Sequence, residues 1–134
     1  MKTFPLQIVT PDGEIFRGQA QKLIVRTIAG DVGILPNHAD YVTALGMGQA
    51  KVVLEDATAR LAACIGGLLT VTKGSVKLVA TTFEWAENID LARAERSKER
   101  AESVLTQKEK HTSEELALAE ARLKRALVRS SVGR

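Results

Sequence analysis

The sequence is poor in cysteine, in tyrosine and tryptophan, and in long apolar runs. The lone Cys64 excludes an internal disulfide and suits a reducing compartment. We expect its side chain to be a small buried hydrophobic group. With one tryptophan and one tyrosine, the chain offers few rings on which nucleobases stack. No apolar run reaches the ~18 residues of a membrane-spanning helix, and no signal pattern leads the chain, so we expect neither membrane insertion nor secretion.

Glycine and proline are absent between Gly74 and Gly133, so nothing in that stretch forces a helix to break. Helix start signals occur at Asn88 or Asp90, and again at Thr112 with Glu115 three residues later. Small or apolar residues recur on one face of each predicted helix: Leu91, Ala94, Ala101 and Leu105, then Leu116, Ala119, Leu123, Ala126 and Leu127. Alanine buries little area, so we predict a two-helix hairpin near the balance between docked and separated states.

The preceding part of the chain has the shorter period of β-strands. Short apolar runs alternate with turn signals such as Pro11-Asp12-Gly13, Gly66-Gly67 and Lys73-Gly74. Seven or more such runs predict an antiparallel sandwich or flattened barrel, with Pro5 and Pro11 at an edge or turn. The fold class is therefore α+β, with a strand domain over 1–84 and a helical domain over 88–134.

Charge is divided unevenly between these two domains. Residues 1–89 carry eight basic and eight acidic side chains, whereas residues 90–134 carry eleven basic and eight acidic ones. From Arg122 onward there are five basic residues and no acid. We expect an anionic partner to meet the terminal helix.

The segment from Gly30 to Asp40 reads as a tight loop with two apolar residues, Ile34 and Leu35, at positions where a loop is normally polar. It either folds back onto the core or meets a partner. His38 near Asp31 and Asp40 suggests an acid–base site, but no nucleophile or oxyanion donor set accompanies it, so a neutral surface histidine is favoured. No metal-ligand spacing and no glycine-rich phosphate loop occur, so we predict no catalytic site and no metal.

The candidate binding site lies on the predicted helices. Asp90, Arg93 and Arg100 share one helix face, and Arg125 and Arg129 share another. A folded hairpin can direct several guanidinium groups at one polyphosphate, although spacing alone favours a solvated charged face. A nucleic-acid adaptor with a basic tail is the alternative, but acids are interleaved along the first helix.

Three motifs resemble the epsilon subunit of bacterial F-type ATP synthase, the equivalent of the mitochondrial delta subunit. They are Val9-Thr10-Pro11-Asp12-Gly13, Gly33-Ile34-Leu35-Pro36-Asn37-His38-Ala39 and Ile65-Gly66-Gly67-Leu68. The resemblance covers essentially the whole chain. It implies a non-catalytic rotor subunit on the cytoplasmic face of the bacterial cell membrane, which couples proton translocation to ATP synthesis and inhibits hydrolysis through a mobile hairpin.

The same resemblance implies a ten-stranded sandwich, partners and site residues. The sandwich would contact the gamma subunit and the c-ring, the latter through Asp31, Gly33, Ile34, Leu35, Pro36 and His38. ATP, alone or as MgATP, would stabilise the compact hairpin through Glu84, Ile89, Asp90, Arg93, Ala94, Arg100, Arg125 and Arg129. Of these, Ile89 to Ala94 are similar to an I/L-D-x-x-R-A motif. In the extended state, the basic residues Arg122, Lys124, Arg125 and Arg129 would meet acidic segments of the alpha and beta subunits.

Overall fold

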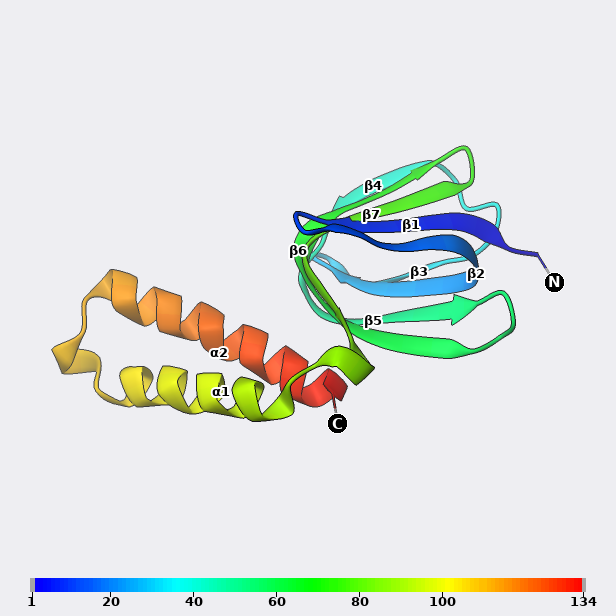
Figure 1. The fold of residues 1–134 in the computed structure, drawn as a ribbon. Helices are drawn as coiled ribbons and strands as arrows, with labels where there is room; N and C mark the ends of the chain where they lie inside the picture. Colours follow the sequence, from blue (N-terminus) through cyan, green and yellow to red (C-terminus); the bar gives the residue numbers. More distant parts are fainter. Residues whose placement is uncertain (1, 134) are drawn as a thin grey trace. The chain divides into compact units, whose positions relative to one another are not determined.

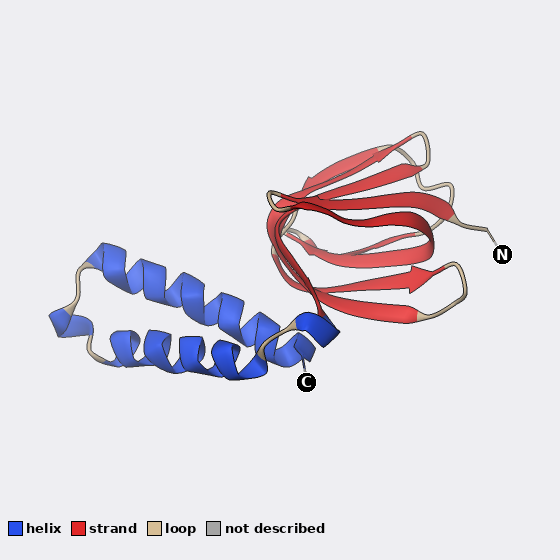
Figure 2. Cartoon of the chain, in the orientation of Figure 1, coloured by secondary structure: helices blue, strands red, loops and turns tan. Residues whose placement is uncertain are grey.

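The computed structural model describes residues 2–133, which form two compact units (Figure 1). One unit ends at Trp85 and contains all the strands, and the other begins at Ala86 and contains the helices (Figure 2). The predicted α+β class, strands first and helices second, is confirmed. The change of period near Phe83 to Asn88 is therefore where one unit gives way to the other.

The strand unit is a flattened barrel. Its strands are β1 (Phe4–Thr10), β2 (Gly13–Thr27), β3 (Gly30–Ile34), β4 (Tyr41–Ala44), β5 (Met47–Leu54), β6 (Ala59–Thr72) and β7 (Ser75–Trp85). Pairing runs β1-β7-β6-β5-β2, and β1 pairs again with β2, so these five strands close on themselves. β3 is added beside β2, and β4 beside β6. Every pairing between these strands is antiparallel except β1 with β7, which is parallel.

Among the described residues there are seven strands, so the expected count of ten is wrong although the class is right. The reason is that glycines bend the long strands without ending them. Gly66 and Gly67 have φ of 69° and 119°, and a Cβ on Gly67 would overlap the carbonyl oxygen of Val79. Before this bend β6 pairs with β5, and after it β6 pairs with β4. The single strand β6 thus occupies the place of two of the expected strands.

The core of the barrel consists of alternate residues of these strands. The largest fully buried side chains are Phe4, Leu6, Ile8, Leu23, Ile34, Leu69 and Leu78. Cys64 is buried among them, as expected, and burial raises the pKa of its thiol to about 12. Trp85 is 6% exposed; the ring of Phe83 meets it edge-on at 5.0 Å, and the Arg60 guanidinium lies 3.7 Å from its ring centre.

The helical unit is an antiparallel hairpin. It comprises η1 (Ala86–Asn88), α1 (Leu91–Thr106), η2 (Lys108–Lys110) and α2 (Ser113–Gly133). The two predicted starts are confirmed, because the Asp90 carboxylate accepts the Arg93 N–H at 3.0 Å and the Thr112 hydroxyl accepts the Glu115 N–H at 3.1 Å. Both side chains satisfy backbone donors that helix geometry leaves open.

The surface between α1 and α2 is built from small residues. The buried residues of the two helices are Ala94, Ala101, Ala119, Ala126, Ser130 and Val132. The leucines predicted for this face lie at its margins and are half-buried, and Leu127 is 45% exposed, so its assignment to the buried stripe was wrong. Small residues let the two helices approach closely. At this distance the larger leucine side chains do not fit in the middle of the contact surface and lie at its edges. The hairpin consequently buries little apolar area for its length.

Candidate functional site

The motif at the start of α1 has a structural role in the hairpin. Asp90 caps the helix, and Ala94 is buried against α2. A Cβ on Gly133 would lie 2.8 Å from Leu91 Cδ2 and 3.1 Å from Ile89 Cγ2, so these apolar side chains lie against the end of α2. The exposed guanidinium of Arg93 makes no hydrogen bond or ion pair with another residue of 2–133. Within the motif, Arg93 is therefore the side chain available to a ligand.

The remaining residues expected at an ATP site come from both units and differ in their surroundings. Glu84 lies in β7 opposite Ala63, within the strand unit, and it has an interaction of its own. Arg129 is half-buried and also has a partner, whereas Arg125 is half-buried. Arg100 is exposed and lines a groove between the helices. Their role in binding ATP stays a prediction.

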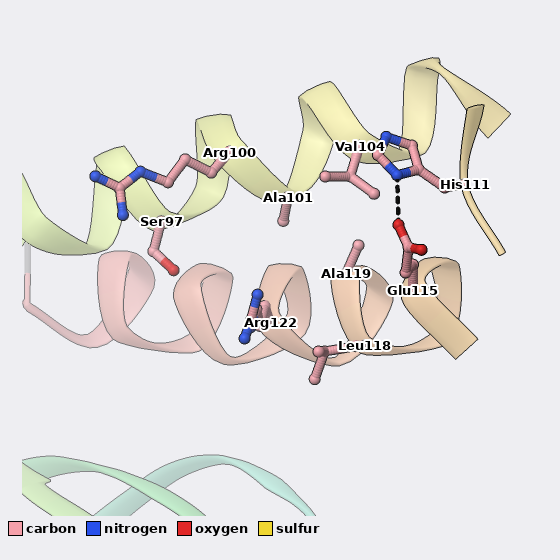
Figure 3. Close-up of a pocket in the computed structure, with 9 residues that line it drawn as sticks. All are labelled: Ser97, Arg100, Ala101, Val104, His111, Glu115, Leu118, Ala119 and Arg122. Carbon is pink, nitrogen blue, oxygen red and sulfur yellow. Dashed lines mark hydrogen bonds and ion pairs between the residues drawn. The ribbon is translucent and has the colours of Figure 1, made fainter. Parts of the chain in front are cut away.

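The groove of about 390 Å³ lies between α1 and α2 (Figure 3). Its lining comprises Ser97, Arg100, Ala101, Val104, His111, Glu115, Leu118, Ala119 and Arg122. On α1 the lining residues Ser97, Arg100 and Val104 continue the face on which Arg93 lies, because they follow it at intervals of four, seven and eleven. Sequence reasoning named Arg100 for ATP and Arg122 for inhibition, but it missed Ser97 and His111 as parts of the same groove.

His111 and Glu115 close one end of the groove. The imidazole Nδ1 lies 2.7 Å from a carboxylate oxygen of Glu115 (Figure 3). This bond, together with the Thr112 hydroxyl and backbone N–H, holds the pKa of the Glu115 carboxyl below its usual range. The Glu115 carboxylate is thus already bonded to residues of the connection that precedes α2.

The segment from Gly30 to Asp40 is partly strand, so its assignment as a loop was wrong for its first five residues. Gly30–Ile34 forms β3, since these residues pair with Leu23–Thr27 of β2. Ile34 is fully buried and Leu35 is 54% exposed, so one apolar residue joins the core while the next faces outward. Gly33 is exposed, and Pro36 is half-buried in the turn that follows.

His38 does not form an acid–base pair with either nearby carboxylate. Its Nδ1 lies 2.7 Å from the Ala39 carbonyl oxygen, and its ring lies 5.7 Å from that of Tyr41. Asp31 is bonded to Arg26 Nε at 2.7 Å, while Asp40 accepts the Lys73 N–H at 2.8 Å. The carboxylates that suggested proton transfer are occupied by other donors.

An apolar row crosses the outer face of the barrel. Ala44 of β4 pairs with Leu68 of β6, Leu68 with Val79 of β7, and Val79 with Val9 of β1. Leu68 and Val79 are 42% and 40% exposed, and Val42 next to the row is 65% exposed. Aligned exposed apolar side chains of this kind are typical of protein contact surfaces.

Residues 2–133 contain neither a membrane-spanning helix nor a cluster of metal-ligating side chains. None of their helices is long and apolar enough to cross a membrane. No group of three or more His, Cys, Asp or Glu residues in 2–133 is arranged to hold a metal ion.

Comparison with protein families accounts for nearly the whole chain. Residues 3–86 match the family described as "ATP synthase, Delta/Epsilon chain, beta-sandwich domain", and residues 87–132 match "ATP synthase, Delta/Epsilon chain, long alpha-helix domain". The chain is 43% identical over 133 residues to the ATP synthase epsilon chain of Ruminococcus albus, covering 98% of this chain and 97% of that protein. It is 37% identical to the epsilon chain of Caldanaerobacter subterraneus, covering 98% and 94%.

Solved structures with the same fold come from mitochondrial ATP synthases. A chain of the Euglena gracilis OSCP/F1/c-ring assembly matches with a TM-score of 0.86 at 19% identity, covering 98% of this chain and 82% of that one. A chain of the Tetrahymena thermophila central stalk and c-ring matches with a TM-score of 0.65 at 12% identity, covering 99% and 98%. At these identities the likeness establishes the fold.

Proposed function

The chain belongs to the ATP synthase delta/epsilon family, and on that premise we propose that it is the epsilon subunit of a bacterial ATP synthase rotor. It is a non-catalytic subunit of the central stalk. In this proposal it takes part in coupling proton translocation to ATP synthesis at the cytoplasmic face of the membrane. Family membership replaces the alternative of a nucleic-acid adaptor, which rested on the basic tail alone.

One observation carries the proposal: two family models match end to end and in the order of the two units. The strand unit supplies the contact with the gamma subunit and the c-ring. Two surfaces support this assignment, namely the exposed residues at the end of β3, such as Leu35, and the apolar row through Leu68 and Val79. Both surfaces expose apolar area to water in the isolated chain, and contact with another subunit would bury that area.

In this proposal the hairpin regulates ATP hydrolysis by changing between a compact form and a form with separated helices. Its alanine surface gives the compact form little stability, so a ligand or partner with modest differential affinity changes the population. ATP favours the compact form through Arg93 and its neighbours. Without ATP the helices separate, and the basic stretch from Arg122 to Arg129 meets acidic segments of the alpha and beta subunits.

Removal of the hairpin tests whether the strand unit is sufficient for assembly and the hairpin is responsible for inhibition. We compare ATPase activity of the assembled enzyme containing the full chain with that containing residues 1–87. Hydrolysis rises in the truncated enzyme while gamma and the c-ring remain associated. Loss of assembly, or unchanged hydrolysis, would refute the assignment of restraint to the hairpin.

The ATP site needs a probe other than tryptophan fluorescence, because Trp85 is packed within the strand unit against Phe83 and Arg60. Calorimetric titration of ATP into the full chain measures binding directly. Arg93→Gln abolishes or greatly weakens it. Arg96→Gln removes the same charge from an exposed position on the same helix and serves as the matched control. Equal loss in both variants would mean that no specific site exists.

A further inference from the structure

Arg26 and Asp31 form an ion pair across the ladder between β2 and β3. The two residues are direct partners in the register of these strands. Arg26 Nε lies 2.7 Å from one carboxylate oxygen of Asp31, and a second guanidinium nitrogen lies 3.5 Å from the other. About half of each side chain is exposed, and an exposed pair contributes only about 0–1 kcal/mol to stability. Folding alone therefore gives little reason for this pair.

Two glycines beside Arg26 make room for its aliphatic stem. Gly48 lies in β5, and a Cβ there would lie 2.7 Å from the Cβ of Arg26 and 3.1 Å from its Cγ. Just before β5, a Cβ on Gly46 would lie 3.4 Å from the same Cγ. Neither glycine has a positive φ, so the space that the stem occupies, and not the backbone conformation, calls for glycine. Arg26 thus packs on β5 while its guanidinium binds Asp31.

The turn that joins β2 to β3 is held by bonds that do not involve the Arg26 side chain. Thr27 is 2% exposed, and its hydroxyl donates to the Gly30 carbonyl oxygen at 2.7 Å. The same hydroxyl accepts the Ala29 N–H at 3.1 Å. These bonds already fix the path of the backbone. The guanidinium of Arg26 consequently acts on the charge and position of the Asp31 carboxylate.

The outward face of β3 carries one charge, that of Asp31. Farther along this face come Gly33, with open space where a Cβ would lie, and Leu35, which is 54% exposed. We propose that Arg26 is a positioning residue of the rotor contact: it neutralises Asp31 and holds the carboxylate against β2, so that β3 presents an uncharged, largely apolar surface. The partner that fits this surface is an uncharged segment of the c-ring. The inference rests on the proposed function, which assigns the end of β3 to that contact.

The ion pair matters when a partner removes water from it. Two opposite charges that enter an interface together remain paired, whereas a single charge left there is unpaired and costly. Loss of Arg26 alone therefore weakens the contact, and loss of both charges together is close to neutral. A direct pairing of Asp31 with a cation of the c-ring has the opposite consequence. Arg26 would then compete for the carboxylate, and its loss would tighten binding.

Binding of the full chain to the detergent-solubilised gamma–c-ring complex, measured by biolayer interferometry, tests the inference. Arg26→Gln weakens the affinity by about tenfold or more. The double variant Arg26→Gln with Asp31→Asn binds within about threefold of the wild-type chain. Lys22→Gln removes one positive charge from an exposed position of β2 outside the pair and changes the affinity by less than about twofold. Urea denaturation followed by Trp85 emission verifies that all variants unfold at similar midpoints.

Three results would overturn the inference while leaving the proposed function intact. They are equal affinities of Arg26→Gln and Lys22→Gln, a double variant that binds no more tightly than Arg26→Gln, and tighter binding by Arg26→Gln. The last of these would assign Asp31 to a cation of the c-ring. Absence of binding by the wild-type chain would refute the proposed contact itself, and the inference with it.

Discussion

The Nδ1 atom of His111 lies 2.7 Å from a carboxylate oxygen of Glu115, and this contact joins the connection between the helices to the first turn of α2. The pair is solvent-exposed, so its contribution is small in isolation. It lies, however, beside an alanine contact surface that contributes little itself. Small polar contacts of this kind consequently matter to the balance between docked and separated helices.

Acidification should weaken the hairpin through Glu115. Its carboxyl has a lowered pKa in the folded chain, so its contribution to stability is complete above the unfolded pKa and is lost as pH falls through the folded pKa. Glu115→Gln therefore flattens the fall in helix stability between about pH 6 and pH 3. Glu114→Gln, in the same turn, is the control and retains the fall. Hydrogen exchange of α2 against pH measures it; identical profiles in both variants would count against the contact.

Ser130→Ala should strengthen the compact hairpin. Ser130 is 4% exposed, and its hydroxyl has no hydrogen-bond partner within residues 2–133. Removing a buried unpaired hydroxyl raises the free energy of opening by about 1–2 kcal/mol, including the better helix propensity of alanine. The exposed Ser131→Ala has only the propensity gain of about 0.5 kcal/mol. Hydrogen exchange compares them, and equal gains would show that the hydroxyl carries no penalty.

Local signals predicted the helices well because their determinants are local. Asp90 and Thr112 act as caps, and alanine at seven-residue spacing marks the buried face. The sandwich was less predictable, since strand length depends on partners distant in the chain. Gly66 and Gly67 look like a turn in the sequence, and only the pairing of β6 with both β4 and β5 shows that they bend one strand.

Only part of the candidate site could be predicted, because sequence spacing is informative within one helix and not between two. Spacing along one helix placed Asp90, Arg93 and Arg100 on a common face. It could not show that Arg122 of α2 and Arg100 of α1 line the same groove, because that depends on how the two helices align. Glu84 came from the resemblance alone, and the structure describes it within β7, in the strand unit.

Gly67→Ala should destabilise the strand unit severely. The residue has a φ of 119°, and an added Cβ would overlap the Val79 carbonyl. Backbone strain and overpacking together cost about 3–5 kcal/mol. Gly74→Ala, at a φ of 79° with open space around its Cβ, costs about 1 kcal/mol. Urea denaturation followed by Trp85 emission compares the two, and similar midpoints would contradict the role given to the bend.

Trp85 should report on the strand unit alone. The aromatic rings and the cation that surround it, from Phe16, Phe83 and Arg60, all belong to that unit. Truncation after Glu87 therefore leaves its emission maximum unchanged. Arg60→Gln, which removes the cation over the ring, alters its emission intensity in both the full and truncated chains. A shift of the maximum on truncation would show that the hairpin contributes to the environment of Trp85.

Hydrogen exchange of the isolated full chain tests the central claim, that the hairpin is only weakly held in its compact form. Amides of α1 and α2 are predicted to exchange through openings of much lower free energy than those of β6 and β7, and to become slower when a phosphate ligand is added. Protection of the helices equal to that of the barrel in the absence of ligand would contradict the account.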